Sequence, residues 1–381
     1  MSLTKDLKNG HLRTWIEIKT AAVKNNYDAW RRVISPSVRL MGIVKSNAYG
    51  HGLVPFAQLL EKLGVDYLGV DSIVEAVRLR EMGIKKDILV LGYTRPDNFA
   101  SASEQDITLT ISTLENWRAL SNLKLEKVLK VHLKVDTGMH RQGFLMEDFE
   151  QLLKELPTQK SQIIIEGVYS HLAAASNTEL KNSVVAQQQE FEKFLDKLDQ
   201  AGIKRENLIK HLAASGGAMG YPETHYDMVR IGLGMYGYYP SPEWEKNFAA
   251  KIKLEPVLTW KTIVGEVKVI PEDGTVGYDC TEAVAAGTKL AVCPIGYWHG
   301  YPRALSSLGL ARVGGVTVKA VGRISMDMIV LDVTKVPAVK VGDEVTLLGP
   351  DVAPATQATL AHTSQYEIIT CLNPLVERFY V

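Results

Sequence analysis

The sequence has 381 residues, of which 46% are hydrophobic, and this is enough to bury a sizeable core in more than one compact unit. Lysine plus arginine and aspartate plus glutamate number 43 each, and this balance argues against nucleic acid or an anionic membrane surface as the main partner. Three cysteines without a CxxC pair, a polar start and no apolar run of about 18 residues predict a cytoplasmic protein without disulfides, a metal site or a membrane span.

The first two-thirds of the chain alternates short apolar runs with amphipathic segments. Segments such as 54–64 and 183–202 repeat apolar residues at spacings of three and four and end in glycine, which predicts helices. The apolar runs are nearly continuous, which is typical of parallel strands covered on both faces. Eight such runs occur, at residues 39–44, 66–71, 87–93, 107–112, 128–136, 163–172, 207–215 and 227–237.

Eight strand–helix units favour an α/β fold of the (β/α)₈ TIM-barrel type. The alternative on the pattern alone is an open, doubly wound sheet. From about residue 250 the rhythm changes to strand-like runs separated by turns, such as 257–270, 311–323 and 343–349, and a helical pattern returns only in the tail at 358–372. We therefore predict an N-terminal strand segment (1–20) that pairs with the β domain, a barrel (21–249) and a mostly β C-terminal domain (250–381).

Residues at the strand ends indicate the chemistry, because reactions in such barrels take place at the carboxyl ends of the strands. Lys45 ends the first barrel strand, and a lysine whose pKa is lowered can form a Schiff base with a carbonyl. Tyr49 follows four residues later, where we expect the next helix to start. Ser215 and Gly232, after the last two strands, offer groups that bind phosphate. Such a lysine with a phosphate site is what pyridoxal 5′-phosphate needs, whereas a lone lysine reaching from a strand end to water would need no cofactor.

Eight separate motifs, in the same order, resemble those of the alanine racemase family. They are VKSNAYGHG (44–52), VDTGMHRQG (135–143), YSHLA (169–173), MVRIGLGMYG (228–237), VGYDCTE (276–282), IGYWHGYPR (295–303), VGRISMDM (321–328) and SQYEI (364–368). The resemblance extends from about residue 12 to the end of the chain. It implies a pyridoxal-phosphate enzyme, built from a barrel plus a β domain, that converts L-alanine to D-alanine for cell-wall peptidoglycan. It also implies a homodimer in which each chain completes the other's site.

The resemblance assigns roles to individual residues. It implies that Lys45 carries the cofactor and that Lys45 and Tyr278 are the two catalytic bases. Further cofactor contacts are implied for Tyr49, Arg141, His171, Ser215, Arg230, Gly232, Leu233 and Tyr366. Arg230 would face the pyridine nitrogen, Arg141 and Met326 would contact the substrate, and Tyr297 and Arg303 would line the entrance. Many family members carbamylate the lysine that corresponds to Lys134, and an unmodified Lys134 paired with a carboxylate is the alternative.

Inversion at Cα requires removal of a proton from one face and its return to the other, so two bases on opposite faces are expected. Lys45 and Tyr278 fit these positions. The cofactor ring spreads the negative charge that is left on Cα. Because arginine stays protonated, Arg230 would not protonate the ring nitrogen, and a weaker electron sink would limit side reactions such as transamination.

The chain departs from the commoner family pattern near the phosphate site and the entrance. Ala214 stands where Asn is usual, and Trp298-His299 replace Ala-Asp. Ser325, Met328 and Gln365 stand where Cys, Gln and Asn are usual. These changes remove no catalytic group, but they bear on substrate preference. Alanine is the first choice of substrate, with serine or a broader range of amino acids as the alternative.

Three rival functions use parts of the same pattern. An amino-acid decarboxylase on the same plan would carry a longer Gly-rich phosphate loop and a catalytic cysteine late in the chain, whereas Cys371 lies in the apolar run IITCL. A non-catalytic pyridoxal-phosphate carrier would lack the β domain that holds Tyr278. A Schiff-base aldolase without cofactor would leave Ser215 and Arg230 unexplained.

Overall fold

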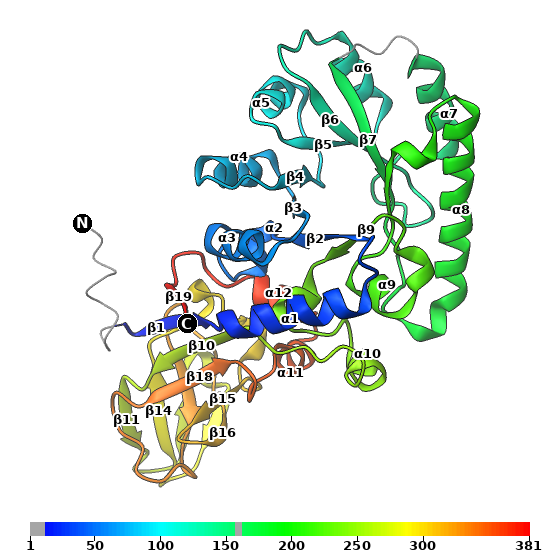
Figure 1. The fold of residues 1–381 in the computed structure, drawn as a ribbon. Coiled ribbons are helices and arrows are strands. Elements are labelled where there is room, and N and C mark those ends of the chain that lie inside the picture. The colour runs from blue at the N-terminus through cyan, green and yellow to red at the C-terminus, as the bar shows by residue number, and fades with distance from the viewer. Residues whose placement is uncertain (1–11, 157–161) are drawn as a thin grey trace. The chain divides into compact units, whose positions relative to one another are not determined.

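The computed structural model describes residues 12–156 and 162–381 (Figure 1). The chain divides into two compact units. Of the described residues, the barrel unit comprises those within Val23–Ala48 and Leu53–Glu255, and the β unit comprises 12–22, Tyr49–Gly52 and Pro256–Val381. The β unit is thus assembled from three stretches of the chain, and the short stretch Tyr49–Gly52 lies directly after the predicted Schiff-base lysine.

The barrel unit contains the parallel sheet that the sequence predicts. Within the described residues the sheet has eight strands in the order β8-β7-β6-β5-β4-β3-β2-β9. A parallel bridge between Ala214 and Arg230 and the hydrogen bond from the Arg230 N–H to the Ala213 carbonyl (3.0 Å) join the segment after β8 to β9, so the sheet nearly closes on itself. The strands are β2 (Arg39–Ile43), β3 (Tyr67–Val70), β4 (Asp87–Val90), β5 (Thr108–Ile111), β6 (Leu129–Lys134), β7 (Ile163–Tyr169), β8 (Ile209–His211) and β9 (Met228–Ile231).

Helices alternate with these strands, and the longest, α8, runs along the outside of the sheet in Figure 1. Ser72 caps the start of α4 in a reciprocal arrangement with Glu75, and Thr113 caps α6. Gly64 and Gly202 follow α3 and α8 with positive φ, as the sequence pattern predicts for helix ends. The helices are α1 (Thr20–Val33), α2 (Lys45–Tyr49), α3 (Leu53–Leu63), α4 (Ile73–Glu81), α5 (Phe99–Glu104), α6 (Leu114–Asn122), α7 (Met146–Glu155), α8 (Lys181–Gln200), α9 (Ser215–Gly220) and α10 (Pro242–Phe248).

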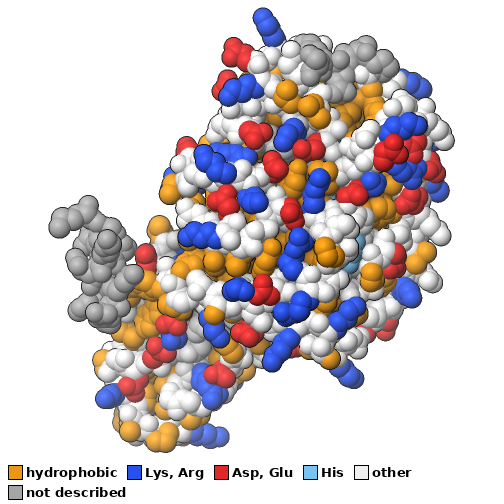
Figure 2. Space-filling view, viewed as in Figure 1, with side chains coloured by type: hydrophobic (Ala, Val, Ile, Leu, Met, Phe, Trp, Pro, Cys, Tyr) orange, Lys and Arg blue, Asp and Glu red, His pale blue; other side chains and the backbone are white. Residues whose placement is uncertain are grey.

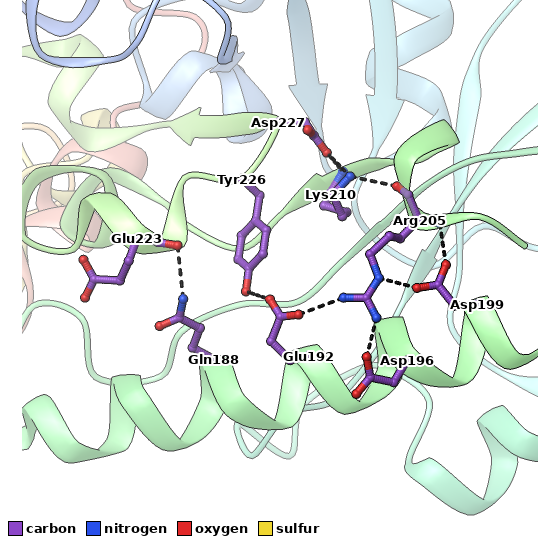
Figure 3. Close-up of polar contacts among 9 residues, drawn as sticks. All are labelled: Gln188, Glu192, Asp196, Asp199, Arg205, Lys210, Glu223, Tyr226 and Asp227. Atoms are coloured by element: carbon purple, nitrogen blue, oxygen red, sulfur yellow. Dashed lines mark hydrogen bonds and ion pairs between the residues drawn. The ribbon is translucent and has the colours of Figure 1, made fainter.

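An ion-pair cluster around Arg205 ties α8 to the loops beside β8 and β9 (Figure 3). The Arg205 guanidinium contacts the carboxylates of Glu192, Asp196 and Asp199, which lie on successive turns of α8. The Tyr226 hydroxyl donates to Glu192 at 2.6 Å. These groups are partly exposed, so each pair alone contributes little, but the shared guanidinium fixes the helix against the two strands that carry Ser215 and Arg230 at their ends.

A bulge interrupts the pairing of β6 with β7. Val131 pairs with Ile165, and His132 pairs with Gly167, so Glu166 is an extra residue on β7. A bulge bends its strand and redirects a side chain. Here the irregularity coincides with buried polar residues, because His132 is fully buried and Glu166 contacts it.

The β unit contains mostly antiparallel sheets, in line with the mostly β domain that the run of short strands predicts. A six-stranded sheet has the order β16-β15-β18-β10-β1-β19, and β1 pairs antiparallel with β10 and parallel with β19. Smaller sheets are formed by β11-β14-β17 and by β12-β13. The strands are β1 (Thr14–Ile18), β10 (Leu258–Ile263), β11 (Glu266–Val269), β12 (Gly274–Val276), β13 (Glu282–Val284), β14 (Lys289–Cys293), β15 (Leu310–Val313), β16 (Val316–Lys319), β17 (Ile329–Asp332), β18 (Glu344–Leu348) and β19 (Arg378–Tyr380).

The helical tail of the β unit is split into α11 (Pro354–Leu360) and α12 (Gln365–Thr370). His362 lies between them with positive φ, and Ser364 caps α12 through the N–H of Glu367. Across the described ranges, 12–156 and 162–381, no helix is both long and apolar enough to cross a membrane. On the face shown in Figure 2, basic and acidic side chains are interspersed, in line with the balanced composition.

Candidate active site

Lys45 follows β2 at the carboxyl end of the barrel sheet, as predicted, and begins an unusual turn. Ser46, Asn47, Ala48 and Tyr49 all have φ between 51° and 55°, so α2 is a left-handed turn. Residues with a Cβ rarely adopt this conformation, and each costs about 1–2 kcal/mol. Backbone strain of this kind persists only where the surrounding structure enforces it, and it is concentrated at functional sites.

Two side chains of the barrel unit hold the left-handed turn. Glu75 accepts the Ser46 N–H at 2.7 Å through one carboxylate oxygen, and through the other it accepts the N–H groups of Asp71 and Ser72. The Asn47 side chain accepts the N–H of Leu53, the first residue of α3, at 2.9 Å. We expected Tyr49 to start the next helix, but α3 begins only at Leu53, because the left-handed turn intervenes.

The Lys45 ammonium lies 3.1 Å from the Asp71 carboxylate, at the end of the neighbouring strand β3. The same Glu75 that holds Ser46 also holds the Asp71 backbone. A single carboxylate therefore fixes both the strand end that carries the lysine and the loop that carries its ion-pair partner. Sequence reasoning missed Asp71 and Glu75, since neither belongs to a quoted motif.

Arg230 on β9 is buried and makes five hydrogen bonds from its two terminal nitrogens. Nη1 donates to Nδ1 and the carbonyl oxygen of His211, at 2.8 and 3.0 Å. Nη2 donates to the carbonyls of Ser170 and Leu212 and to Nδ1 of His171, at 2.8, 2.9 and 3.2 Å. Burial lowers the pKa of the Arg230 guanidinium to about 10, so it remains a cation at neutral pH.

His171 lies beside Arg230, and its backbone carbonyl is held by Gln187. Burial, followed by the charges of Arg230 and Arg141, holds the pKa of His171 well below 6.5. His171 is therefore neutral at pH 7, and its Nδ1 is free of a proton where it accepts from Arg230. The Gln187 side chain donates to the His171 carbonyl at 3.1 Å and accepts the Ala173 N–H at 2.8 Å, which fixes the loop after β7.

Ser215 and the segment after β9 come together as the sequence predicts for a phosphate site. The Ser215 Oγ accepts N–H groups from Gly232 (3.1 Å) and Gly234 (3.4 Å). Leu233 starts a short 3₁₀ turn, Leu233–Tyr236. Ala214 precedes α9 and supplies no side-chain cap, so the first N–H groups of that helix have no partner within it. With its oxygen already accepting two N–H groups, the Ser215 hydroxyl can direct its proton outward.

Lys134, at the end of β6, lies among other cations. Burial, followed by the charges of Arg230, Arg141 and Lys45, lowers the pKa of the Lys134 amine to about 8. Asp136 acts in the opposite direction, and the Lys134 amine donates to the Gln142 side chain at 3.0 Å. The unmodified amine thus contacts an amide oxygen, and the choice between a carbamylated Lys134 and one paired with a carboxylate stays a prediction.

The remaining predicted residues belong to the β unit. The Tyr49 and Tyr366 rings lie 6.0 Å apart, which brings together two of the predicted phosphate contacts. Tyr278 starts the 3₁₀ turn Tyr278–Cys280, and 69% of it is exposed. Arg323 pairs with the neighbouring Asp279 and so anchors this turn.

The unusual Trp298-His299 pair lies in the 3₁₀ turn Tyr297–His299. His299 is buried, and its Nδ1 accepts the N–H of Gly296 at 3.1 Å. The N–H groups of Tyr297 and Trp298 donate to the carbonyls of Ser325 and Met326, both at 3.1 Å. His299 therefore stabilises the loop that holds the Met326 backbone.

The two other entrance and loop positions also have local partners. The Ser325 hydroxyl donates to the Met328 carbonyl at 2.9 Å, which closes a tight turn around Met326. Arg303 starts the 3₁₀ turn Arg303–Leu305, and its carbonyl accepts the Ser306 hydroxyl at 2.6 Å. Met326 and Tyr297 are 52% and 43% exposed.

Sequence reasoning also missed a buried polar group inside the barrel. Glu166 contacts His132, His132 contacts His211, and His211 contacts Arg230, each through a side-chain hydrogen bond. The available signal was weak, because a histidine or glutamate within an apolar strand run is compatible with an ordinary core position.

Comparison with known proteins covers almost the entire chain. Residues 18–240 match the family model described as the N-terminal domain of alanine racemase, and residues 257–380 match its C-terminal domain. The chain is 38% identical to alanine racemase of Methanococcus maripaludis over 374 residues, covering 96% of this chain and 98% of that protein. It is 39% identical to alanine racemase of Symbiobacterium thermophilum over 379 residues, covering 98% of each.

Solved structures give the same result. Alanine racemase of Clostridium difficile aligns with a TM-score of 0.90 and 32% identity, covering 97% of this chain and 96% of that chain. Alanine racemase of Bacillus anthracis with bound L-Ala-P aligns with a TM-score of 0.90 and 31% identity, covering 97% and 95% of the two chains. The predicted resemblance is therefore confirmed.

Proposed function

The chain belongs to the alanine racemase family, and on this basis we propose that it interconverts L- and D-alanine with pyridoxal 5′-phosphate as cofactor. One observation carries the proposal beyond family membership. Arg230 is buried on β9, and both of its terminal nitrogens donate to fixed acceptors. The neighbouring strands β2 and β8 are followed by Lys45 and Ser215. Because an arginine keeps its protons, it suits a pyridine nitrogen that is to stay unprotonated.

The residues present fit this cofactor. Lys45 supplies the amine that would hold the aldehyde covalently. Ser215, the uncapped start of α9 and the N–H of Leu233 supply donors for a phosphate, and Gly232 permits close approach of the backbone. When bound, the cofactor supplies a ring that withdraws negative charge from Cα of the amino acid. His171 and Arg141 would stand beside the ring, and Tyr49 and Tyr366 would complete the phosphate contacts.

Racemisation requires proton transfer on both faces of Cα, and Lys45 and Tyr278 are the proposed bases. Lys45 would serve one face. The Tyr278 phenol would serve the other, and its 69% exposure suits a group that acts on a second chain rather than on its own core. Arg141 and the Met326 backbone would hold the substrate carboxylate. Alanine is the favoured substrate, since the Tyr366 ring would crowd a larger side chain, and serine remains the alternative.

The shared site implies a homodimer. Like Tyr278, other large side chains of the β unit are exposed in the single chain: Tyr297, Trp298, Met326 and Met328 are between 43% and 55% exposed. The backbone hydrogen bonds from Tyr297 to Ser325 and from Trp298 to Met326 place them on adjoining loops. An exposed apolar group of this size favours a protein partner, and a second copy of the chain would be that partner. We infer that such dimers act in the cytoplasm to supply D-alanine for peptidoglycan.

Chiral chromatography tests the reaction directly. The protein, incubated with pyridoxal phosphate and L-alanine or L-serine, should produce the D-enantiomer without release of carbon dioxide. Borohydride reduction followed by peptide mapping should place the cofactor on Lys45. K45A should lose both signals, and K62A, at an exposed lysine near the end of α3, should retain them. Carbon dioxide release, or a trapped cofactor elsewhere, would overturn the proposal.

Mixed dimers test the shared site. K45A and Y278F homodimers should both be inactive. If each site takes its lysine from one chain and its tyrosine from the other, a mixed dimer contains one intact site. Unfolding and refolding the two variants together should then restore about a quarter of wild-type activity. No recovery, with dimers present by light scattering, would place both bases in the same chain.

A further inference from the structure

We propose that Glu166, His132 and His211 form a one-way hydrogen-bond chain inside the barrel that positions Arg230, with both imidazoles neutral and protonated on Nε2. This hydrogen-bond chain links side chains of four neighbouring strands, β7, β6, β8 and β9. Its catalytic consequence rests on the proposed function, whereas its hydrogen-bond pattern does not. None of the three residues touches a group that would react, so each is a positioning residue.

The distances link the four side chains without a gap. Glu166 Oε2 lies 3.2 Å from Nε2 of His132. Nδ1 of His132 lies 2.8 Å from Nε2 of His211, and Nδ1 of His211 lies 2.8 Å from Nη1 of Arg230. Both imidazoles are fully buried, so water does not compete for these groups.

The two ends determine the direction of every hydrogen bond. Arginine can only donate, so Nδ1 of His211 must accept and its proton is on Nε2. That Nε2–H donates to Nδ1 of His132, which places the His132 proton on Nε2, facing Glu166. An ionised carboxylate can only accept, so Glu166 requires the same hydrogen-bond direction as Arg230 does. Burial lowers the pKa of His132 and holds the pKa of His211 well below 6.5, which keeps both rings neutral at pH 7.

The backbone around Glu166 is built for this contact. Glu166 is the extra residue of the β6–β7 bulge. Next to it, a Cβ at Gly167 would lie 2.6 Å from two ring atoms of His132 and 2.6 Å from the Ile209 carbonyl. A side chain at position 167 would therefore push the His132 ring out of line. The bulge and the glycine together indicate that this strand is shaped around the histidine.

Neighbouring groups fix both ends of the chain. The Tyr67 hydroxyl donates to the same Glu166 oxygen at 3.0 Å, and Lys130 lies 3.4 Å from the other oxygen. The Tyr169 ring stacks on His211 at 4.5 Å with an interplanar angle of 8°. The Tyr169 hydroxyl is in turn bonded to Thr110 at 2.9 Å. His211 therefore cannot turn away from Arg230 without breaking a packed and hydrogen-bonded contact.

This arrangement explains how Arg230 keeps one orientation. Nη1 is held by His211, the last member of the hydrogen-bond chain, and Nη2 is held by backbone carbonyls and by His171. The two anchors fix the plane of the guanidinium, and its Nε–H, which neither anchor uses, would be the donor to the pyridine nitrogen of the proposed cofactor. Loss of Glu166 would leave the His132 Nε2–H buried without a charged acceptor and loosen the inner anchor.

Neutron diffraction of the deuterated wild-type holoenzyme near pH 7 tests the hydrogen-bond pattern directly. The expected result is a single deuteron on each ring, on Nε2 of His132 and Nε2 of His211, with none on Glu166. A deuteron on Nδ1 of either ring, or on Glu166, would overturn the proposal. This readout requires no activity, so it stands even if the protein acts on another amino acid.

Kinetics of Glu166 variants test the positioning role. E166M removes the acceptor, and E166Q retains an amide oxygen that can accept. D87N is the matched control, because Asp87 contacts the same Lys130 at 3.6 Å but is not a member of the hydrogen-bond chain. Misplacement of a positioning group can cost up to about 100-fold, so we expect E166M to lower kcat per cofactor-loaded site about 10- to 100-fold. KM for alanine should stay within about twofold of wild type.

E166Q should recover most of the lost kcat, and D87N should match wild type. A purely structural role for Glu166 would lower the folded or loaded fraction but leave kcat per loaded site unchanged, and that outcome would overturn the proposal. If the wild-type holoenzyme does not racemise any amino acid, the proposed function fails, and the neutron result alone decides the hydrogen-bond chain.

Discussion

Lys134 is expected to react with carbon dioxide near neutral pH. The neutral amine attacks carbon dioxide, forms an N–C bond and releases one proton, which yields a carbamate. Burial and neighbouring cations lower the Lys134 pKa to about 8. At pH 7 about one amine in ten is then neutral, against about one in 3,000 for a lysine with the usual pKa of 10.5, so the reactive form is enriched about 300-fold.

The charges around Lys134 favour the product. Arg230, Arg141 and Lys45 all act on this amine as cations, and Asp136 is the acid that opposes them. Carbamate formation replaces a positive group with a negative one, so repulsion becomes attraction. The new anion could hold Arg141, which the proposed function places against the cofactor and the substrate carboxylate.

Carbon-13 NMR of protein equilibrated with ¹³C-bicarbonate measures this modification. The wild type should show one carbamate signal, which K134Q should lose and K130Q should keep. Lys130 lies four residues earlier on β6, and although burial lowers its pKa, Glu166 and Asp87 raise it overall, so its amine stays protonated. A wild type without the signal, or a K134Q variant that retains it, would refute the reasoning.

Three further results are expected. G167A should destabilise the fold by about 1–3 kcal/mol in urea unfolding, because its Cβ would overlap His132. The control G274A, at an exposed glycine without positive φ whose added Cβ would come no closer than 3.8 Å to another atom, should show no such loss. Burial raises the Glu166 pKa, but the hydrogen bond from His132, the charge of Lys130 and the hydrogen bond from Tyr67 outweigh it and lower the pKa from 4.5 to about 2. Wild type should therefore lose up to about 3 kcal/mol relative to E166Q as pH falls from 4.5 to 2, with the difference constant above pH 5. E75A should lower the unfolding free energy by about 2–4 kcal/mol through loss of the Ser46 anchor and the α4 cap, while E81A on the same helix should change it by less than about 0.5 kcal/mol; equal effects would exclude the anchor.

The barrel strands could be predicted because burial on both faces produces nearly continuous apolar runs. β3, β5 and β9 are buried at every position, and no competing pattern interrupts them. The positions of Lys45, Ser215 and Arg230 followed from the rule that strand ends meet at one edge. Those predictions depend on the local sequence and on the order of the strands, and both can be read from a single sequence.

The inner polar chain could not be predicted for a physical reason. His132, Glu166 and His211 lie on three different strands, and their contact depends on strand register. The bulge at Glu166 shifts that register by one residue, which reverses the face on which later side chains lie. A sequence pattern with period two predicts the strand, but it does not reveal where an extra residue is inserted.

The left-handed turn after Lys45 could not be predicted either, because its local backbone energy is unfavourable. Four residues at about 1–2 kcal/mol each amount to about 4–8 kcal/mol of unfavourable backbone energy. The bonds from Ser46 to Glu75 and from Leu53 to Asn47 return about 1–3 kcal/mol each. Local interactions therefore do not favour this turn, and propensities would predict a right-handed helix start. Burial of Ala48 and the contacts of the flanking segments, set by distant parts of the chain, must supply the difference. A conformation that the local sequence disfavours, directly after the lysine proposed to carry the cofactor, is best explained by a requirement to present that amine in one direction.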